Sequence, residues 1–149
     1  MASSGSLNTS SYEGRYLQLS WTQTDKNPTT NKSKIKWTLS SIGGSSAYYS
    51  TGYYETGSKE EGTIVKINGE QVYHKLRTDW TTYAFPAAKG SVSGEIDVSH
   101  SNDGTGSIKV ELTTAIYYYA KSTVSKTWTL DTIPRASTPT LSASSVNMG

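Results

Sequence analysis

Residues 94–116, with the sequence GEIDVSHSNDGTGSIKVELTTAI, decide the fold class of this chain. Apolar side chains alternate with polar ones on both sides of a turn sequence: Ile96, Val98, Ile108, Val110, Leu112 and Ile116. A period of two is typical of a strand with one buried face, and an Asp-Gly pair between two such runs favours a β-hairpin. We therefore expect a hairpin, with Asp103 and Gly104 both at positive φ, at the centre of a β-sandwich.

The same alternation recurs on either side of this stretch. The expected strands are Tyr16–Gln23, Lys32–Ile42, Thr63–Ile67, Glu70–Leu76 and Thr123–Leu130. Their inward positions carry Leu17, Leu19, Trp21, Ile35, Trp37, Leu39, Trp128 and Leu130. The sequence thus predicts an all-β chain whose core contains the tryptophans Trp21, Trp37 and Trp128.

Two details of these strands give sharper expectations. Asn68-Gly69 predicts a type I′ turn, and a two-residue loop would place Val65 opposite Val72 and Ile64 opposite Tyr73. The strand at 32–42 points three lysines outward: Lys32, Lys34 and Lys36. An edge strand protected by charge explains them best, and an anion-binding stripe is the alternative.

The length, composition and charge of the chain limit its domain count and its partners. A chain of 149 residues suits one domain. Since it contains no cysteine, disulfides contribute nothing to its stability. The formal charge of +2 is too small to favour nucleic acid as a partner. Because no apolar run approaches a membrane span, membrane insertion is not expected, and the polar residues 1–11 do not form a signal peptide.

We divide the chain into three parts. Residues 1–11 are interpreted as a flexible N-terminal arm, with a short first edge strand as the alternative. Residues 12–133 form the predicted domain, a single antiparallel β-sandwich of about eight strands, either jelly-roll or immunoglobulin-like. Residues 134–149 are interpreted as a Pro/Ser-rich linker that leads to a further domain.

Catalytic and metal chemistry find little support. The two histidines are His74 and His100, and there is no thiol for a zinc or nucleophile site. His100 is in phase with Ile96 and Val98, so we expect it to point inward or cap the turn, with Asp103 as acceptor of its ring N–H. No Gly-x-Ser-x-Gly sequence is present. We expect no enzyme activity, no cofactor and no metal.

The aromatic residues carry the argument for binding. The chain has 11 Tyr and 4 Trp but 1 Phe, so most rings have a polar edge. Residues outside the regular alternation or in tyrosine runs suit sugar, because a ring face stacks on C–H groups while polar neighbours bond hydroxyls. The candidate carbohydrate-binding residues are Asp79, Trp80, Tyr83, Tyr117 and Tyr119. Cross-strand packing or contact with another subunit is the alternative for the same rings.

Four segments also resemble a known family: 15–23 (RYLQLSWTQ), 37–39 (WTL), 98–106 (VSHSNDGTG) and 132–137 (TIPRAS). They are similar to the N-terminal β-domain of minor structural proteins in the tail tips of long-tailed phages of Gram-positive hosts. The resemblance implies a virion location, synthesis in the bacterial cytoplasm and a role in host recognition and adhesion. Host cell-wall or surface polysaccharide would be the ligand, and other tail proteins, in multiple copies, would be neighbours.

Two functions therefore remain open. One is a non-catalytic tail-tip module that binds host carbohydrate, and the other is a structural spacer or assembly module that binds no sugar.

Overall fold

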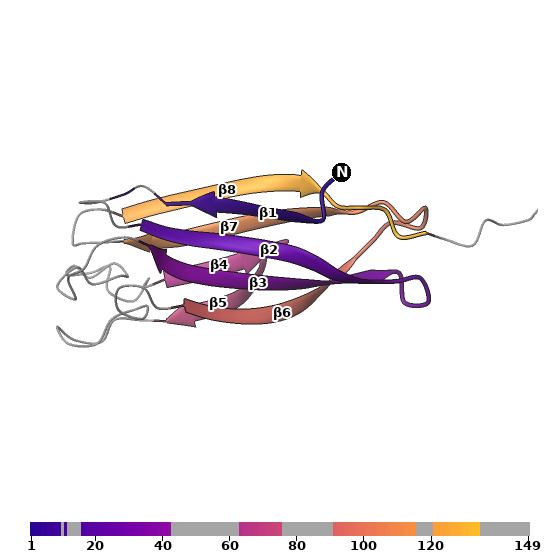
Figure 1. The fold of residues 1–149 in the computed structure, drawn as a ribbon, viewed down its shortest axis with the longest axis horizontal. Coiled ribbons are helices and arrows are strands. Elements are labelled where there is room, and N and C mark those ends of the chain that lie inside the picture. The colour runs from indigo at the N-terminus through magenta and orange to yellow at the C-terminus, as the bar shows by residue number, and fades with distance from the viewer. Residues whose placement is uncertain (10, 12–15, 43–62, 76–90, 116–120, 135–149) are drawn as a thin grey trace, which may run out of the picture.

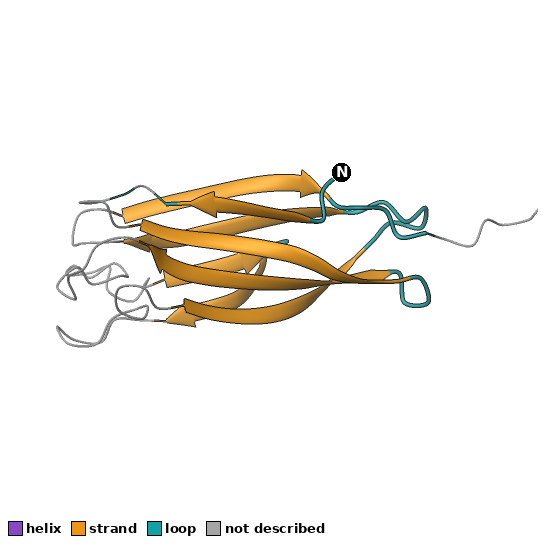
Figure 2. Cartoon of the chain, in the orientation of Figure 1, coloured by secondary structure: helices purple, strands orange, loops and turns teal. Residues whose placement is uncertain are grey.

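The computed structural model describes residues 1–9, 11, 16–42, 63–75, 91–115 and 121–134. These residues contain eight strands and no helix (Figure 2). The strands are β1 (Ser4–Asn8), β2 (Tyr16–Asn27), β3 (Lys32–Ile42), β4 (Thr63–Ile67), β5 (Glu70–Lys75), β6 (Ser91–Ser99), β7 (Ser107–Ala115) and β8 (Lys121–Thr129). The prediction of an all-β sandwich of about eight strands is confirmed. Of the two interpretations of residues 1–11, the edge strand is the one found over Ser4–Asn8.

Two antiparallel four-stranded sheets pack face to face (Figure 1). Their orders are β1-β2-β3-β6 and β5-β4-β7-β8. The odd-numbered strands all finish at one end of the sandwich and the even-numbered strands all begin there (Figure 1). We call this end the loop end. We call the opposite end, which carries the β2–β3, β4–β5 and β6–β7 connections, the turn end.

Inward-facing positions are apolar in the middle of the strands and polar near their ends. The buried apolar core comprises Leu17, Leu19, Trp21, Ile35, Trp37, Leu39, Val65, Ile67, Val98, Ile108, Val110, Leu112 and Leu130. Thr63 and Thr114, also buried, bond to each other through their hydroxyls at 2.7 Å near the loop end. Ser33 and His100 are the corresponding buried polar groups at the turn end. At these four positions the core is thus closed by hydrogen-bonded side chains.

One row of residues crosses the whole first sheet and places its largest side chains. Gly5 of β1 pairs with Trp21 of β2, Trp21 pairs with Trp37 of β3, and Trp37 pairs with Gly94 of β6. A Cβ atom at Gly94 would lie 2.7 Å from the Trp37 ring, and one at Gly5 would lie 2.7 Å from Nε1 of Trp21. Glycine on the flanking strands therefore leaves room for each indole.

The second sheet meets these two indoles with aromatic rings from its edge strands. Trp128 of β8 packs edge-on against Trp21, with ring centroids 5.4 Å apart. Tyr73 of β5 packs edge-on against Trp37 at 6.1 Å, and burial raises the pKa of its hydroxyl. Burial is confirmed for Trp21 and Trp37, whereas Trp128 is half-buried against the core. Edge-to-face contacts suit the aromatic quadrupole.

The expected hairpin at 94–116 is wrong, although both of its strands exist. β6 pairs with β3, whereas β7 pairs with β4 and β8, so residues 100–106 cross from one sheet to the other. A strand period of two reports a buried face and does not report which strand is the neighbour. The turn residues also differ from expectation, since Gly104 has φ 90° but Asp103 is not at positive φ.

The lysine strand is not an edge strand. β3 lies between β2 and β6, and two of its three outward lysines lie opposite acidic residues of β6. Lys34 pairs with Asp97, with their charged atoms 4.0 Å apart, and Lys36 lies opposite Glu95. Opposite charges on neighbouring strands stabilise the pairing, so the lysines serve the β3–β6 contact.

The β4–β5 hairpin is confirmed, with Asn68 at φ 51° and Gly69 at φ 82° as a type I′ turn requires. The expected register is wrong, because Val65 lies opposite Tyr73 and Ile64 opposite His74. A bulge between Val65 and Lys66 leaves Val72 as the extra residue and moves Tyr73 into place against Trp37.

We predict that Gly94→Ala lowers the free energy of unfolding by about 1–3 kcal/mol, because the added methyl overlaps the Trp37 ring. Ser93→Ala, at the exposed neighbouring position, is the control and should change it by less than about 0.5 kcal/mol. Urea denaturation followed by tryptophan fluorescence measures both. Equal midpoints for the two variants would contradict the prediction.

Candidate functional site

The candidate residues Asp79, Trp80, Tyr83, Tyr117 and Tyr119 lie outside the described residues. The strands that flank them are described. β5 ends at Lys75 and β6 begins at Ser91, while β7 ends at Ala115 and β8 begins at Lys121. All four positions lie at the loop end (Figure 1). The same holds for Ile42 and Thr63, which flank the tyrosine-rich residues 47–55.

A polar recess with one aromatic residue lies at the loop end within the described part of the chain. Asn8, Thr9, Ser11 and Tyr16 line this open recess of about 360 Å³, which we call the Tyr16 recess. Thr9 is buried and its hydroxyl accepts the Leu17 N–H at 3.0 Å, so the floor of the recess is fixed to β2. Tyr16 is half-buried, and Asn8 and Ser11 are exposed. An aromatic ring beside amide and hydroxyl groups is the combination that suits a neutral sugar.

The turn end is organised around the ring of His100. Nδ1 of His100 lies 2.7 Å from the Gly104 carbonyl oxygen, and Nε2 lies 2.7 Å from Oγ of Ser33. Because a carbonyl only accepts, Nδ1 is the donor, which leaves Nε2 of an uncharged ring to accept the Ser33 hydroxyl. Gln23 then donates from Nε2 to Oγ of Ser33 at 2.6 Å. We call these four residues the His100 corner.

Hydrogen bonds to backbone carbonyls tie further segments to the His100 corner. The side-chain amide of Asn31 donates to the carbonyls of His100 and Ser101 at 3.0 and 2.8 Å. The N–H of Ile133 donates to the Gly104 carbonyl at 2.9 Å, and Gln23 donates from Nε2 to the Asp131 carbonyl at 3.2 Å. The corner therefore joins the β2–β3 turn, the crossing between the sheets and the segment after β8.

His100 was expected to point inward or cap the turn, and this is confirmed, since it is 8% exposed. The expected acceptor was wrong. Asp103 bonds instead to Thr105, accepting its backbone N–H at 3.0 Å and its hydroxyl at 2.6 Å. These bonds, the hydroxyl first, lower the pKa of Asp103. The Asp103 carboxylate thus bonds within its own turn, and the Gly104 carbonyl oxygen accepts the N–H of the His100 ring.

The Ser33–His100 pair has the spacing of a nucleophile and its base, with a carbonyl in the orienting position. Ser33 is 0% exposed, however, and its oxygen already accepts the Gln23 amide. A substrate cannot reach that hydroxyl without opening the sandwich. The pair is therefore a structural contact between β3 and the start of the crossing segment.

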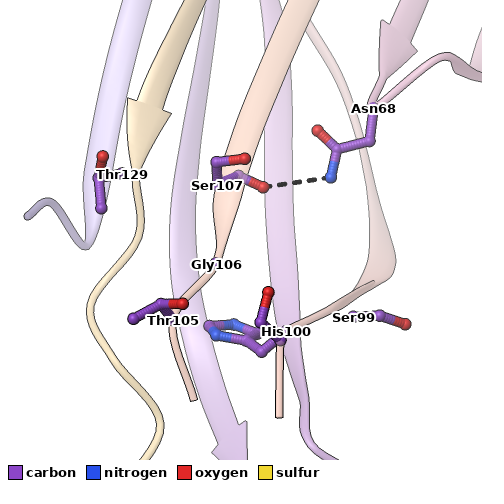
Figure 3. Close-up of a pocket in the computed structure, with 8 residues that line it drawn as sticks. Asn68, Ser99, His100, Thr105, Gly106, Ser107 and Thr129 are labelled. Carbon is purple, nitrogen blue, oxygen red and sulfur yellow. Dashed lines mark hydrogen bonds between the residues drawn. The ribbon is translucent and has the colours of Figure 1, made fainter. Parts of the chain in front are cut away.

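A second open recess, of about 490 Å³, lies beside the His100 corner. Its lining consists of Asn68, Ser99, His100, Ser101, Thr105, Gly106, Ser107 and Thr129 (Figure 3). The Asn68 side chain is already bonded within the protein. Its amide nitrogen donates to the Ser107 carbonyl at 3.2 Å, and its amide oxygen accepts the Lys109 N–H at 2.7 Å. The recess has hydroxyl groups but no Tyr, Trp or Phe among these residues, so it suits a sugar less well than the Tyr16 recess.

Sequence reasoning did not name Gln23 and Ser33 as partners of His100. The signal was present, because Ser33 is in phase with the inward Ile35 and Gln23 is in phase with Trp21. A polar residue in the inward phase near a strand end predicts a buried hydrogen-bond partner.

Within the described ranges, no group of three or more His, Cys, Asp or Glu side chains is placed to hold a metal ion. None of these residues forms an apolar helix long enough to cross a membrane. Comparison with known proteins gives no match to a family model, to a curated protein or to a solved structure.

We predict that Ser33→Ala lowers the free energy of unfolding by about 1–3 kcal/mol, because it leaves both His100 Nε2 and the Gln23 amide without this partner. Ser41→Ala is a matched control on the same face of β3. Ser41 is 2% exposed, and its hydroxyl has no hydrogen-bond partner among the described groups. That variant should be neutral or stabilising in urea denaturation. A loss at Ser41 as large as that at Ser33 would contradict the assigned network.

We also predict a pH-dependent effect of Asp103→Asn. The lowered pKa of Asp103 in the folded state means that the carboxylate adds stability above the ordinary aspartate pKa and loses it as the pH falls through the lowered value. The wild type should therefore exceed the Asn variant in urea midpoint at neutral pH, and the difference should vanish in acid. Thr105→Val, which removes the hydroxyl donor, should weaken this pH dependence. A constant difference from neutral pH to acid would contradict the assignment.

Proposed function

We propose that this chain is a non-catalytic module of a phage tail tip that binds host cell-surface carbohydrate through its loop end. The observation that carries the proposal is the direction of the strands. The ends that flank Asp79, Trp80, Tyr83, Tyr117 and Tyr119 all lie at the loop end. Binding residues are often carried on connections held by a rigid scaffold, and clustering at one end of a sandwich is a common arrangement.

The position of the Tyr16 recess also favours the loop end as the binding end. It brings a half-buried tyrosine together with Asn8 and Ser11. No charged side chain is among its described lining residues, which fits a neutral, hydroxyl-rich ligand better than an anion.

The phage assignment rests on the resemblance of segments 98–106 and 132–137 to tail-tip proteins. In the described part of these segments, the motif residues stabilise the scaffold. His100 and Gly104 belong to the His100 corner, and Ile133 is fully buried with its N–H bonded to Gly104. The resemblance therefore supports a shared scaffold, and the choice of sugar depends on the loop end.

Binding through a shallow site of this kind is weak at each copy. Several copies in a tail would raise the overall affinity through effective concentration, without any new contact. A soluble single copy should accordingly bind host cells far less tightly than a multimeric display of the same chain.

We predict that Tyr16→Ala, Trp80→Ala, Tyr83→Ala and Tyr117→Ala each reduce binding to extracted host wall polysaccharide, because each removes a ring face for stacking. A reduction of about tenfold is expected, since a stacked ring contributes on the order of 1–2 kcal/mol. Titration calorimetry with the purified chain measures the effect, and tryptophan fluorescence checks that each variant folds.

Thr29→Ala and Asn102→Ala are the controls, because both residues are exposed at the turn end. They should leave binding unchanged. If all the loop-end variants bind as the wild type does, the proposed site is wrong. If the wild type binds neither the polysaccharide nor whole host cells, the proposed function is wrong.

A structural or assembly role in the tail is the second candidate. The observation that favours it is the outer edge of β6, to which no described strand is bonded and which offers main-chain groups to another chain.

A further inference from the structure

The outer edge of β6 differs from the other three sheet edges. β6 pairs with β3 over the whole range Ser91–Ser99, without a register shift. On its other side no described strand is bonded to it. The strand contains no proline, lysine or arginine, which are the residues that commonly protect an exposed edge.

The remaining edges are protected in ways that β6 is not. β1 and β8 close one side of the sandwich together, since Ala2 bridges Leu130 and Gly5 lies against Trp128. β5, on the other side, is interrupted by the bulge at Val72. Among the described strands, β6 therefore offers the longest regular edge for pairing with another chain.

The two faces of β6 restrict which partner fits. Its wet face exposes Ser91, Ser93, Glu95, Asp97 and Ser99, and its inner face carries Val92, Gly94, Ile96 and Val98. Val92 and Ile96 are half-buried and pack against the core. A partner strand that continues the sheet must place apolar residues beside these two and must not place acidic residues beside Glu95 and Asp97.

We propose that β6 pairs with β6 of a second copy of this chain, antiparallel, about a two-fold axis at Gly94. In this register Val92 lies opposite Ile96 of the second copy on the inner face. On the wet face Ser93 lies opposite Glu95, and Ser91 lies opposite Asp97. Val92 and Ile96 thus meet each other in both halves of the pair, and no acidic residue meets another. The two four-stranded sheets become one sheet of twice the width.

Two neighbouring registers are rejected by charge. An axis at Glu95 would place the two copies of that residue opposite each other. An axis at Ile96 would place Glu95 opposite Asp97 twice. An axis between two consecutive residues would bring inner-face residues opposite wet-face residues, which an antiparallel pleated sheet does not allow. Axes at Ser93 and at Val98 bring no two acidic residues together, but they place Ile96 opposite a residue outside β6. The charges and the pairing of Val92 with Ile96 together select the axis at Gly94.

Pairing through β6 does not depend on carbohydrate binding. Because the paired β6 strands run in opposite directions, the loop ends of the two copies point away from each other. The dimer would therefore not place two loop ends on the same surface, and the failure of either proposal leaves the other standing.

The test is the oligomeric state of the full chain, measured by sedimentation equilibrium over a range of concentrations. The expected result is a reversible monomer–dimer equilibrium. In Ser93→Lys the added positive charge lies opposite Glu95 of the second copy at both symmetry-related positions, so the dimer dissociation constant should fall on the order of fivefold. Ser93→Glu should raise the dissociation constant by a similar factor. Ser93 is exposed, so both variants should keep the fold.

Ser6→Lys and Ser6→Glu are matched controls, because Ser6 is an exposed serine of β1 at the opposite edge of the same sheet. They should leave the equilibrium unchanged. A chain that stays monomeric at all concentrations would overturn the proposal. So would a dimer that responds equally to charge at positions 6 and 93, or at neither.

Disulfide cross-linking tests the register separately, because the natural chain contains no cysteine that would interfere. Ser93→Cys and Glu95→Cys proteins are prepared separately and oxidised alone and as an equal mixture. In the proposed register the introduced thiol at 93 lies opposite that at 95 of the other copy, so the mixture should cross-link far more than either protein alone. Equal cross-linking in all three samples, or none in the mixture, would overturn the assigned register.

Discussion

The fold depends on giving two neighbouring indoles room on the inner face of one sheet. Trp21 and Trp37 lie side by side on β2 and β3, and each has glycine as its neighbour on the outer strand, Gly5 and Gly94 respectively. Any larger residue in those two places would overlap a ring. Because the glycines fit the indoles in one alignment, the row fixes the register of all four strands.

The second sheet is complementary to this row. Its inner strands β4 and β7 bring aliphatic side chains such as Val65 and Val110, while its outer strands bring the rings of Tyr73 and Trp128. The bulge in β5 is part of the same solution, since it places Tyr73 against Trp37. The fit between the shapes of these side chains selects this packing more than the number of apolar residues does. Such packing suits a chain in which 34% of the residues are apolar.

Much of this arrangement follows from the sequence. Strand identity, the inward face of each strand and the burial of Trp21 and Trp37 all follow from a period of two. The pairing of strands does not, because alternation is the same whether β6 neighbours β7 or β3. The partner of His100 was missed for a related reason: Asp103 is close in the chain, whereas Ser33 is brought near by the pairing of β3 with β6. The candidate residues at 79–83 and 117–119 lie outside the described residues, so they remain predictions.

The alternation of strand direction has a consequence for how such a chain changes over generations. Each strand passes once between the two ends, so residues gained or lost at the loop end leave the Gly-Trp-Trp-Gly alignment and the His100 corner in place. The conformational cost of a longer connection grows slowly with its length. If the loop end binds the host as proposed, binding specificity can therefore change by insertion and deletion at one end while the scaffold is kept. The same property makes the loop end the natural place to graft foreign segments.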